Sequence, residues 1–263
     1  MAITSFLKKH WLASAVALFI GFPALSAVLG SAILLAYIYW PHQFDSIDFS
    51  RFTTARPELI ILAHGVRDNT TSWVDPLRDV YRNNGFDGDV LPVDWSKYAG
   101  SSVSCAIEGR RIGELIGERV AHSTRVRSVH LIGHSCGAFV VYGACMAIKE
   151  KRPDIVVQAT YLDPVSVYGP FWNYGLSHFG YCADYSESYI DTEDDVPGSN
   201  QLVPNTHTYD VTATRSPDHR DVRPHNWPTI YYRNLVETKR EPELWRDPNL
   251  PTTKPPDVLE LVE

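Results

Sequence analysis

Short apolar runs separated by polar turns follow a long apolar N-terminal segment in this chain. After that segment, β-branched and apolar runs predict strands at 58–63, within 88–95, at 129–132, at 155–162, around 186–191 and at 207–213. Apolar positions at helical spacing predict helices at 72–84, capped by Thr71 or Ser72, and at 104–122 and 225–237. Strands that alternate with helices are typical of a mostly parallel sheet flanked by helices.

The apolar segment at 12–40 contains no charged residue, and a bilayer span needs only about 20 residues. Lys8 and Lys9 precede it, and aromatic residues at 37–40 close it. We therefore expect an uncleaved signal-anchor with a cytoplasmic N-terminus and the rest of the chain outside the cytoplasm. Small residues at 24–27 leave the alternative of a cleaved signal peptide and a secreted protein, but signal peptides usually have apolar regions of only about 7 to 15 residues.

The remaining composition fits one globular domain, since a hydrophobic content of 44% suffices for a full-sized core. We expect an anchor at 1–40, a polar connector at 41–56, the domain at 57–240 and a Pro-rich flexible tail at 241–263. Two of the 24 Lys and Arg residues precede the span, which leaves 22 basic against 31 acidic side chains and argues against nucleic acid as a partner. The ten histidines are scattered without a metal-binding motif, so no metal site is expected.

The most specific chemical signal is Gly133-His134-Ser135-Cys136-Gly137, which lies between a predicted strand and a helix-compatible stretch. In this setting G-x-S-x-G forms a nucleophile elbow, with glycine where a Cβ would crowd the strand or the helix. The turn would hold the Ser135 hydroxyl above the sheet edge, at the positive end of the following helix. We therefore expect Ser135 to be a nucleophile.

A nucleophilic serine needs a base, an acid that orients the base, and donors for an oxyanion. Asp163 ends the strand after the elbow unit, at the same sheet edge, and is the expected acid. His225 precedes the last predicted helix and is the expected base. The alternatives that the spacing leaves open are Asp191 and Asp210 for the acid, and His219 and His207 for the base.

The segment 63–66, at the end of the first predicted strand, suits an oxyanion loop because its glycine lets the backbone approach a substrate. We expect the two donors to be the backbone N–H groups of Val66 and Cys136. His64 and His134 are expected in the walls of the substrate site.

Four cysteines follow the span, and an exported domain permits disulfides. The spacings of Cys105, Cys136, Cys145 and Cys182 do not fix a pairing. Because the backbone N–H of Cys136 is needed at the nucleophile, we expect its side chain to be a free, buried thiol.

The run from Ile60 to Pro164 resembles the catalytic domain of the pancreatic-type lipase family, which includes lipases, phospholipases A1 and yolk-protein relatives. The stretches that recur there in this order are ILAHG, SWVDPL, VLPVDWS, EGRRIGELI, HLIGHSCGAFVVYGA and YLDPV; ADYSESYIDT and HNWPTIYY are similar more loosely. The resemblance implies an α/β-hydrolase fold, with the acid in an LDP motif that Asp163 matches and the catalytic histidine in the segment of His225.

Other features depart from that family. Only about a dozen residues separate the strand at 207–213 from His225, too few for the long lid of the larger lipases, which favours phospholipase- or esterase-like behaviour. The aromatic loop at 165–183, with Phe171 and Trp172, is expected to form either an apolar wall for an acyl chain or part of the core. The family's structural calcium site is not clearly matched, and its candidate oxygen ligands are Asp184, Asp194 and Asp195.

These observations predict a membrane-tethered serine hydrolase that cleaves carboxylic esters, of lipids or small molecules, through an acyl-enzyme and without a cofactor. One alternative is a non-catalytic lipid- or protein-binding module on the same fold, against which the complete Ser, Asp and His set argues. The other is an acyltransferase with the same triad, which the sequence does not separate from a hydrolase.

Overall fold

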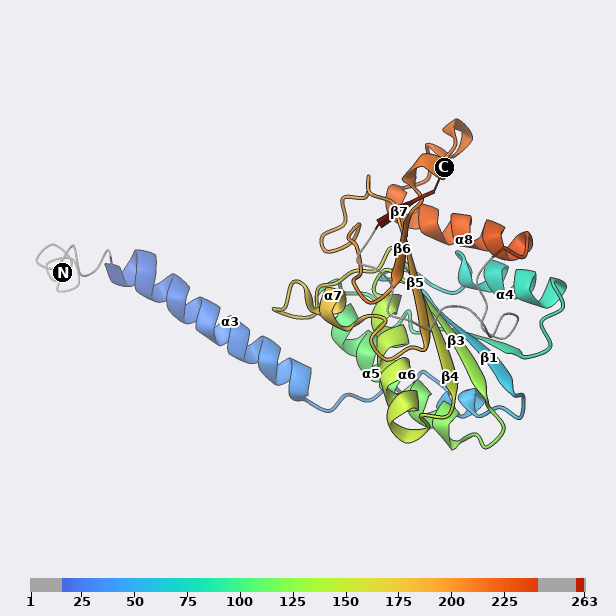
Figure 1. The fold of residues 1–263 in the computed structure, drawn as a ribbon. Coiled ribbons are helices and arrows are strands. Elements are labelled where there is room, and N and C mark those ends of the chain that lie inside the picture. The colour runs from blue at the N-terminus through green and yellow to red at the C-terminus, as the bar shows by residue number, and fades with distance from the viewer. Residues whose placement is uncertain (1–15, 241–258, 263) are drawn as a thin grey trace, which may run out of the picture. The chain divides into compact units, whose positions relative to one another are not determined.

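The computed structural model describes residues 16–240 and 259–262 and divides into two units, one ending at Gln43 and one beginning at Phe44 (Figure 1). The first unit contains η1 (Ala17–Gly21), a π-helical turn, followed directly by α3 (Phe22–Tyr39). Pro23 has no amide hydrogen and its ring crowds the carbonyl four residues earlier, which accounts for the wider turn before it.

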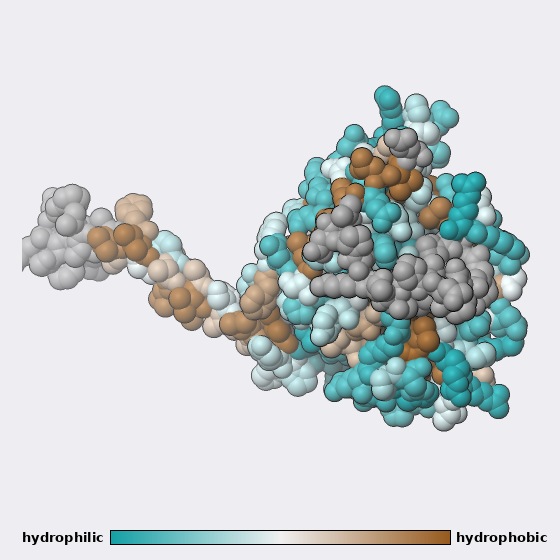
Figure 2. All heavy atoms as spheres, in the orientation of Figure 1, coloured by the Kyte–Doolittle hydropathy of each residue, from teal (hydrophilic) through white to brown (hydrophobic). Residues whose placement is uncertain are grey.

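The helix of the first unit has the length and composition of a membrane span. It runs over 23 residues, Ala17–Tyr39, and none of its residues is fully buried. Figure 2 shows apolar side chains along this helix and a largely polar surface on the visible face of the second unit. A signal sequence near the N-terminus has the same length and composition as such a span.

Among the described residues, the sheet of the second unit contains seven parallel strands in the order β2-β1-β3-β4-β5-β6-β7. The strands are β1 (Glu58–Ala63), β2 (Asp89–Val93), β3 (Ser128–His134), β4 (Val156–Leu162), β5 (Tyr185–Ile190), β6 (His207–Asp210) and β7 (Leu259–Leu261). Because Ala63 pairs with Gly133 and His134 with Leu162, the carboxyl ends of β1, β3 and β4 meet at one edge. The strand order reverses between β1 and β3, and open parallel sheets bind ligands beside such a point.

Helices cover both faces of the sheet. They are α4 (Val74–Asn83), α5 (Cys105–His122), α6 (Gly137–Lys151), α7 (Tyr174–His178) and α8 (Trp227–Glu237), with short 3-10 turns η2 (Phe49–Phe52), η3 (Thr212–Thr214), η4 (Pro217–His219) and η5 (Pro224–Asn226). In Figure 1, α4 and α8 lie over one face, and α5 and α6 over the other. A Cβ at Gly113 or at Gly143 would lie 2.1 Å from a backbone carbonyl oxygen of the facing helix, so glycine allows α5 and α6 to pack closely.

The predicted parallel α/β architecture is confirmed, and the differences concern the ends of elements and a few short elements that were not expected. The helix expected at 72–84 begins at Val74 with Trp73 as its N-cap and no side-chain cap, because Thr71 bonds to the side chain of Asn69 instead. The strand expected at 207–213 ends at Asp210 and is followed by η3. The short helix α7 lies inside the segment expected to be a loop.

The connector and the tail also contain more structure than the polar composition indicated. Phe44 and Phe52, both within 41–56, are buried, and η2 occupies part of that segment. Leu259–Leu261 form β7, parallel to β6, so the expectation of a flexible tail is wrong for these residues. The rest of the expected tail, 241–258, and the segment 1–15 lie outside the described residues.

Candidate active site

The turn after β3 holds Ser135 in a backbone conformation that most residues avoid. Its φ is 56°, between the end of β3 at His134 and the start of α6 at Gly137. A Cβ at Gly133 would lie 2.5 Å from the carbonyl oxygen of Gly137, and one at Gly137 would lie 2.4 Å from that of Ala63. Glycine at both positions therefore lets strand, turn and helix approach as a nucleophile elbow requires.

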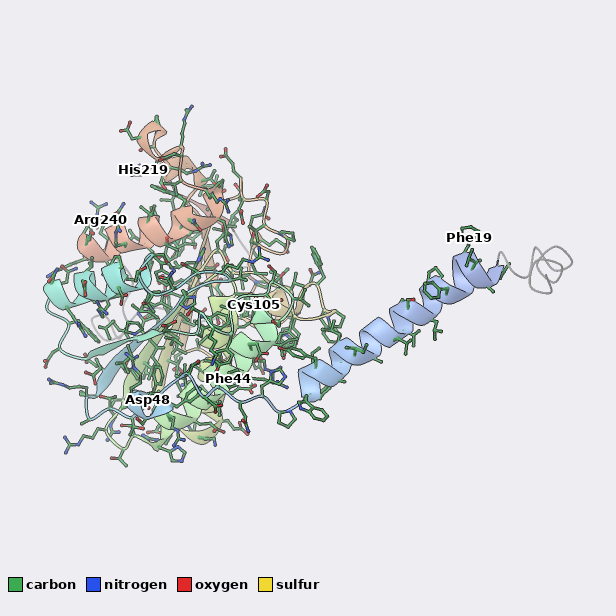
Figure 3. All side chains as sticks on the ribbon, turned by 180° about the vertical axis from the view of Figure 1, so that it is seen from behind. Phe19, Phe44, Asp48, Cys105, His219 and Arg240 are labelled. Carbon is green, nitrogen blue, oxygen red and sulfur yellow. A yellow bond between two sulfur atoms is a disulfide. The ribbon has the colours of Figure 1, made fainter. Side chains whose placement is uncertain are left out.

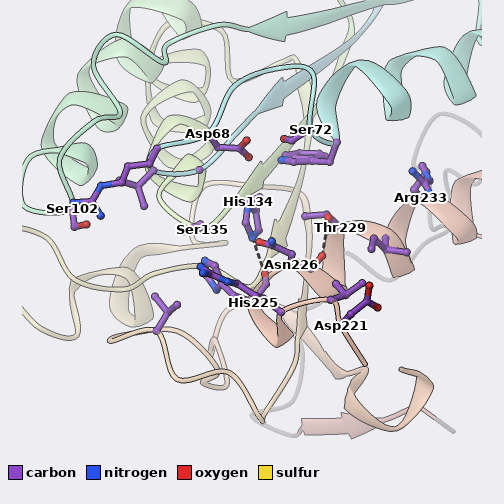
Figure 4. A pocket seen from close by; sticks show the side chains of 18 residues that line it. Asp68, Ser72, Ser102, His134, Ser135, Asp221, His225, Asn226, Thr229 and Arg233 are labelled. Carbon is purple, nitrogen blue, oxygen red and sulfur yellow. Dashed lines mark hydrogen bonds between the residues drawn. The ribbon is translucent and has the colours of Figure 1, made fainter. Parts of the chain in front are cut away.

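The Ser135 side chain lies in the wall of a cavity of about 830 Å³ (Figure 4). It is only 1% exposed, and its Oγ makes no hydrogen bond with any described residue. Its amide donates to the carbonyl oxygen of Leu162 at 3.0 Å, which ties the turn to the end of β4. Buried polar groups are nearly always hydrogen-bonded. A buried hydroxyl without a partner, beside a cavity and at a helix N-terminus, is therefore a candidate reactive group.

His225 lines the same cavity from η5, the turn that leads into α8. Its Nδ1 lies 2.8 Å from Oδ2 of Asp194 and 3.2 Å from Oδ2 of Asp163. Because Nδ1 is engaged with these carboxylates, Nε2 is the ring nitrogen left for Ser135 or a substrate. His225 and Ser135 share the cavity, and no hydrogen bond joins their side chains.

The two carboxylates come from loops that follow neighbouring strands. Asp163 directly follows β4 with a φ of 44°, and its amide donates to the carbonyl oxygen of Tyr189 at 2.8 Å. Asp194 lies in the loop after β5. Their exposed fractions are 0% and 5%. Asp163 thus meets the histidine expected from the sequence, whereas the contact of Asp194 with that histidine was not anticipated.

The charges in this group are unequal. Burial raises the pKa of Asp163 to about 7. Burial also opposes the ionisation of Asp194, but hydrogen bonds from His225 and Ser199 lower its pKa to about 2. Burial disfavours the charged form of His225 as well, yet its hydrogen bonds to the two acids raise its pKa to about 9. The two acids thus favour the charged form of the ring, and Asp194 is the acid that stays ionised more readily.

The other candidate acids have different partners. Oδ2 of Asp191 lies 3.1 Å from Nε of Arg215. Asp210 accepts hydrogen bonds from threonine side chains at the end of β6. Neither residue lines the cavity. Of the acids that follow β5, Asp194 rather than Asp191 contacts His225.

The rival histidines lie outside the cavity. Nδ1 of His219 is 2.8 Å from Oγ of Ser216, and its ring packs against Trp227. His207 begins β6, and its ring stacks on that of Tyr185. His225 is thus the candidate base that shares a cavity with Ser135.

His134 reaches the cavity and His64 does not. Nε2 of His134 lies 2.8 Å from the backbone carbonyl oxygen of His225 (Figure 4). Burial and the charge of His225 lower the pKa of His134 to about 3, so the ring is neutral and donates from Nε2. His64 is fully buried, with Nδ1 2.9 Å from the carbonyl oxygen of Gly65 and Nε2 accepting from the amide of Trp95. His134 therefore holds His225 in place, whereas His64 belongs to the core.

The amides of Val66 and Cys136 donate to no acceptor among the described residues. Val66 lines the cavity just after β1, and Cys136 directly follows Ser135. A Cβ at the intervening Gly65 would lie 2.9 Å from Cβ of Ser135, so the loop after β1 approaches the elbow closely. Two free backbone donors on either side of a candidate nucleophile are what an oxyanion hole requires.

The expectation that Cys136 is a free thiol is wrong, because its sulfur is bonded to Cys105 at the start of α5 (Figure 3). The Cα atoms of the pair are 6.1 Å apart, because the start of α5 packs beside the elbow. Cys145 and Cys182 form a second disulfide. The bond engages only the side chain of Cys136, so its backbone N–H is still available as a donor.

The aromatic residues expected to line an acyl site do not line the cavity. Phe171 is 51% and Trp172 56% exposed. Other rings of the same loop, those of Tyr168, Tyr174 and Phe179, pack around Phe139 of α6. This loop is therefore divided between core packing and an exposed tip.

Charged side chains form much of the cavity wall instead. Figure 4 shows Asp68, Asp221 and Arg233 on different sides of Ser135. Arg67 and Arg223 also line the cavity. Among the described residues neither of these two arginines forms an ion pair, whereas Nε of Arg233 lies 3.6 Å from a carboxylate oxygen of Glu237. Arg67 and Arg223 thus give the cavity cationic groups that can meet a polar or anionic part of a substrate.

The candidate calcium ligands do not form one site. Asp184 pairs with Lys149 at 2.6 Å before β5, whereas Asp194 and Asp195 follow the other end of that strand, about 20 Å away. The described residues contain one group of acids and histidine whose ligand atoms lie within 4.8 Å of one another and could hold a metal ion. Its members are Asp163, Asp194 and His225. Their distances fit hydrogen bonds, and both acids accept further hydrogen bonds from the protein, so we interpret the group as sharing a proton.

Comparison with known proteins gave one family and a distant structural likeness. The model of a family described as the alpha/beta hydrolase family matches residues 60–256. A search of curated proteins gave no match. The solved structures that match include that of a candidate hydrolase of the alpha/beta superfamily from Xanthomonas campestris pv. campestris. It is 15% identical in sequence with a TM-score of 0.41, and the alignment covers 68% of this chain and 98% of that chain.

Proposed function

Because the chain belongs to the alpha/beta hydrolase family, we propose that it is a serine hydrolase that cleaves carboxylic esters, with lipid esters as its main substrates. The proposal depends on one observation: Ser135 and His225 line the same cavity. The Ser135 hydroxyl is buried without a hydrogen-bond partner, and Nδ1 of His225 is bound by two carboxylates. A serine becomes nucleophilic when an oriented base can take its proton, and this arrangement supplies such a base.

The reaction follows from the roles that these groups can take. Oγ of Ser135 attacks the ester carbonyl while Nε2 of His225 accepts the hydroxyl proton. The amides of Val66 and Cys136 hold the oxyanion of the tetrahedral intermediate, and His225 returns the proton to the departing alcohol. Water, deprotonated by His225, then cleaves the acyl group from Ser135, and a carboxylate at Nδ1 stabilises the imidazolium in both steps.

Lipid esters are proposed for two reasons. The chain resembles the pancreatic-type lipase family between Ile60 and Pro164, and an apolar helix long enough to cross a bilayer precedes the hydrolase unit. The charged wall of the cavity favours an ester that also bears a polar or ionic group, as a phospholipid does, over a purely apolar one.

A location outside the cytoplasm is part of the proposal. Lys8 and Lys9 before the apolar helix favour a cytoplasmic N-terminus, and the disulfides Cys105–Cys136 and Cys145–Cys182 need an oxidising compartment. Cleavage of the helix as a signal sequence would yield the same hydrolase in secreted form.

Labelling with a fluorophosphonate tests the proposal on the full chain in detergent. The wild-type protein should be labelled and the Ser135→Ala variant should not. Ser188→Ala is a matched control, because Ser188 is also buried with a hydroxyl that has no partner, but it does not line the cavity. Labelling that survives in Ser135→Ala, or a folded wild-type protein that never reacts, would overturn the assignment and favour a non-catalytic binding module.

A further inference from the structure

Two acids from different loops meet one nitrogen of His225, although a serine triad needs only one. Oδ2 of Asp194 and Oδ2 of Asp163 lie 2.8 Å and 3.2 Å from Nδ1. Both carboxylates are almost fully buried, so water does not screen either of them from the ring. Neither contact is therefore an incidental surface pairing.

Each acid is oriented by its own set of donors. Oδ1 of Asp163 accepts from the amide of Asn200 at 3.3 Å. Oδ1 of Asp194 accepts from the amide of Val196 at 3.2 Å, and its Oδ2 accepts from the hydroxyl of Ser199. The side chain of Asn200 also donates to the backbone carbonyl of Asp194. One short segment, Ser199–Asn200, thus fixes both carboxylates relative to each other.

The other titratable groups around the ring line the cavity and form no hydrogen bond with Nδ1. His134, whose ring centre lies 4.8 Å from that of His225, is buried and neutral, and Arg67, Arg223, Arg233, Asp68 and Asp221 share the cavity wall. The two acids are the groups that bond to Nδ1. The charge on His225 during reaction is therefore governed mainly by these carboxylates.

We propose that two acids position His225. Asp194 is the principal positioning residue, and Asp163 is a second hydrogen-bond acceptor that can replace it. The proposal rests on the proposed serine hydrolase function and assigns to Asp194 a role that the sequence did not indicate. Two neighbouring buried carboxylates resist simultaneous ionisation, so one stays charged and the other retains a proton in the resting state. When His225 becomes charged as it takes the proton of Ser135, the ionised acid holds the Nδ1–H, and where that acid is replaced the other acid can ionise and take over this role.

Redundancy of this kind predicts a specific mutational pattern. Replacing the single acid of a triad by its amide costs about 10⁴-fold in kcat. Here we expect Asp163→Asn and Asp194→Asn each to lower kcat by no more than about 10²-fold, and the double variant by about 10⁴-fold. Asp191→Asn is a matched control, because Asp191 is buried in the same loop but pairs with Arg215, and it should leave kcat within about threefold of wild type.

A titration of His225 separates positioning from a merely structural role. Histidine NMR resonances in the Ser135→Ala protein would give its pKa without turnover. Both acids raise that pKa, so either single amide should lower it, Asp194→Asn more than Asp163→Asn, whereas Asp191→Asn should not move it. Because this readout needs only folded protein, it tests the proposal even if the double variant loses all activity.

The outcomes distinguish this proposal from the function on which it rests. If wild-type protein does not react with a fluorophosphonate, the hydrolase function itself fails. If wild type reacts but one single variant already loses about 10⁴-fold while the other is unchanged in both kcat and the pKa of His225, the chain has an ordinary single-acid triad. Loss of wild-type activity on treatment with EDTA would also overturn the proposal, by indicating that the acids hold a metal ion.

Discussion

The two disulfides provide a matched pair of perturbations, because they close loops of similar size but differ in their distance from the candidate nucleophile. Cys105–Cys136 spans 31 residues and Cys145–Cys182 spans 37. We consider the double variants Cys105→Ala/Cys136→Ala and Cys145→Ala/Cys182→Ala. Loop-closure entropy gives each disulfide about 4 kcal/mol of stabilisation. For a domain of this size that corresponds to a decrease in Tm of roughly 8 to 15 °C in either variant.

Activity should separate the two variants. Cys136 follows Ser135 and supplies a proposed oxyanion donor, so release of its side chain from α5 loosens that donor. A misplacement of about 1 Å can cost about 10²-fold in rate, and we expect a loss of that order in kcat for Cys105→Ala/Cys136→Ala. Cys145 lies further along α6 and Cys182 lies before β5, away from the cavity, so the second variant should keep its kcat.

Thermal unfolding followed by circular dichroism would give the two Tm values, and initial rates of ester hydrolysis well below both would give kcat per folded molecule. Equal losses of kcat in the two variants would refute the argument that the elbow disulfide acts locally. A change in Tm of only a degree or two in both would refute the entropic estimate and place the stabilisation elsewhere.

Three further predictions concern the cavity. In Gly65→Ala a new methyl group would lie 2.9 Å from Cβ of Ser135 and 3.2 Å from Nδ1 of His134. We therefore expect kcat to fall about 10²-fold with little change in circular dichroism. An unchanged kcat would show that the loop after β1 does not contribute to catalysis. A general base must be neutral, and the two acids raise the pKa of His225 to about 9, so kcat/KM should rise with pH up to about that value. A pH profile that is already flat at neutral pH would contradict the assignment of His225 as the base. Arg223→Gln should raise KM more for esters that bear an anionic group than for neutral esters of the same acyl chain, measured on matched substrates in detergent; equal effects would argue against an electrostatic role of the wall.

The parts of the site that the sequence predicted are those fixed by local geometry. Gly133 and Gly137 are needed because neighbouring backbone leaves no room for a Cβ, and such a requirement is visible in a short motif. Asp163 follows the end of β4, and the parallel register brings that end to the same edge as Ser135. His225 was recognisable from its place before the last helix.

The parts that the sequence did not predict depend on contacts between distant segments. Asp194 reaches His225 through a loop whose course depends on Ser199 and Asn200, and no local pattern encodes that course. The pairing of Cys105 with Cys136 depends on how α5 packs against the elbow. β7 is only three residues long, and a strand that short is stable only through its pairing with β6.

The all-parallel sheet affects the order in which the turn at Ser135 and the strands around it form during folding. Parallel neighbours cannot be joined by a tight hairpin, so each pairing must close a long crossover, and such pairings slow folding. The turn at Ser135 needs β1 beside β3, and its amide needs the carbonyl of Leu162 at the end of β4. Helical signal should therefore return early during refolding, and reactivity toward a fluorophosphonate only late. The rate at which Ser135 becomes reactive toward a fluorophosphonate would thus report the last step of folding.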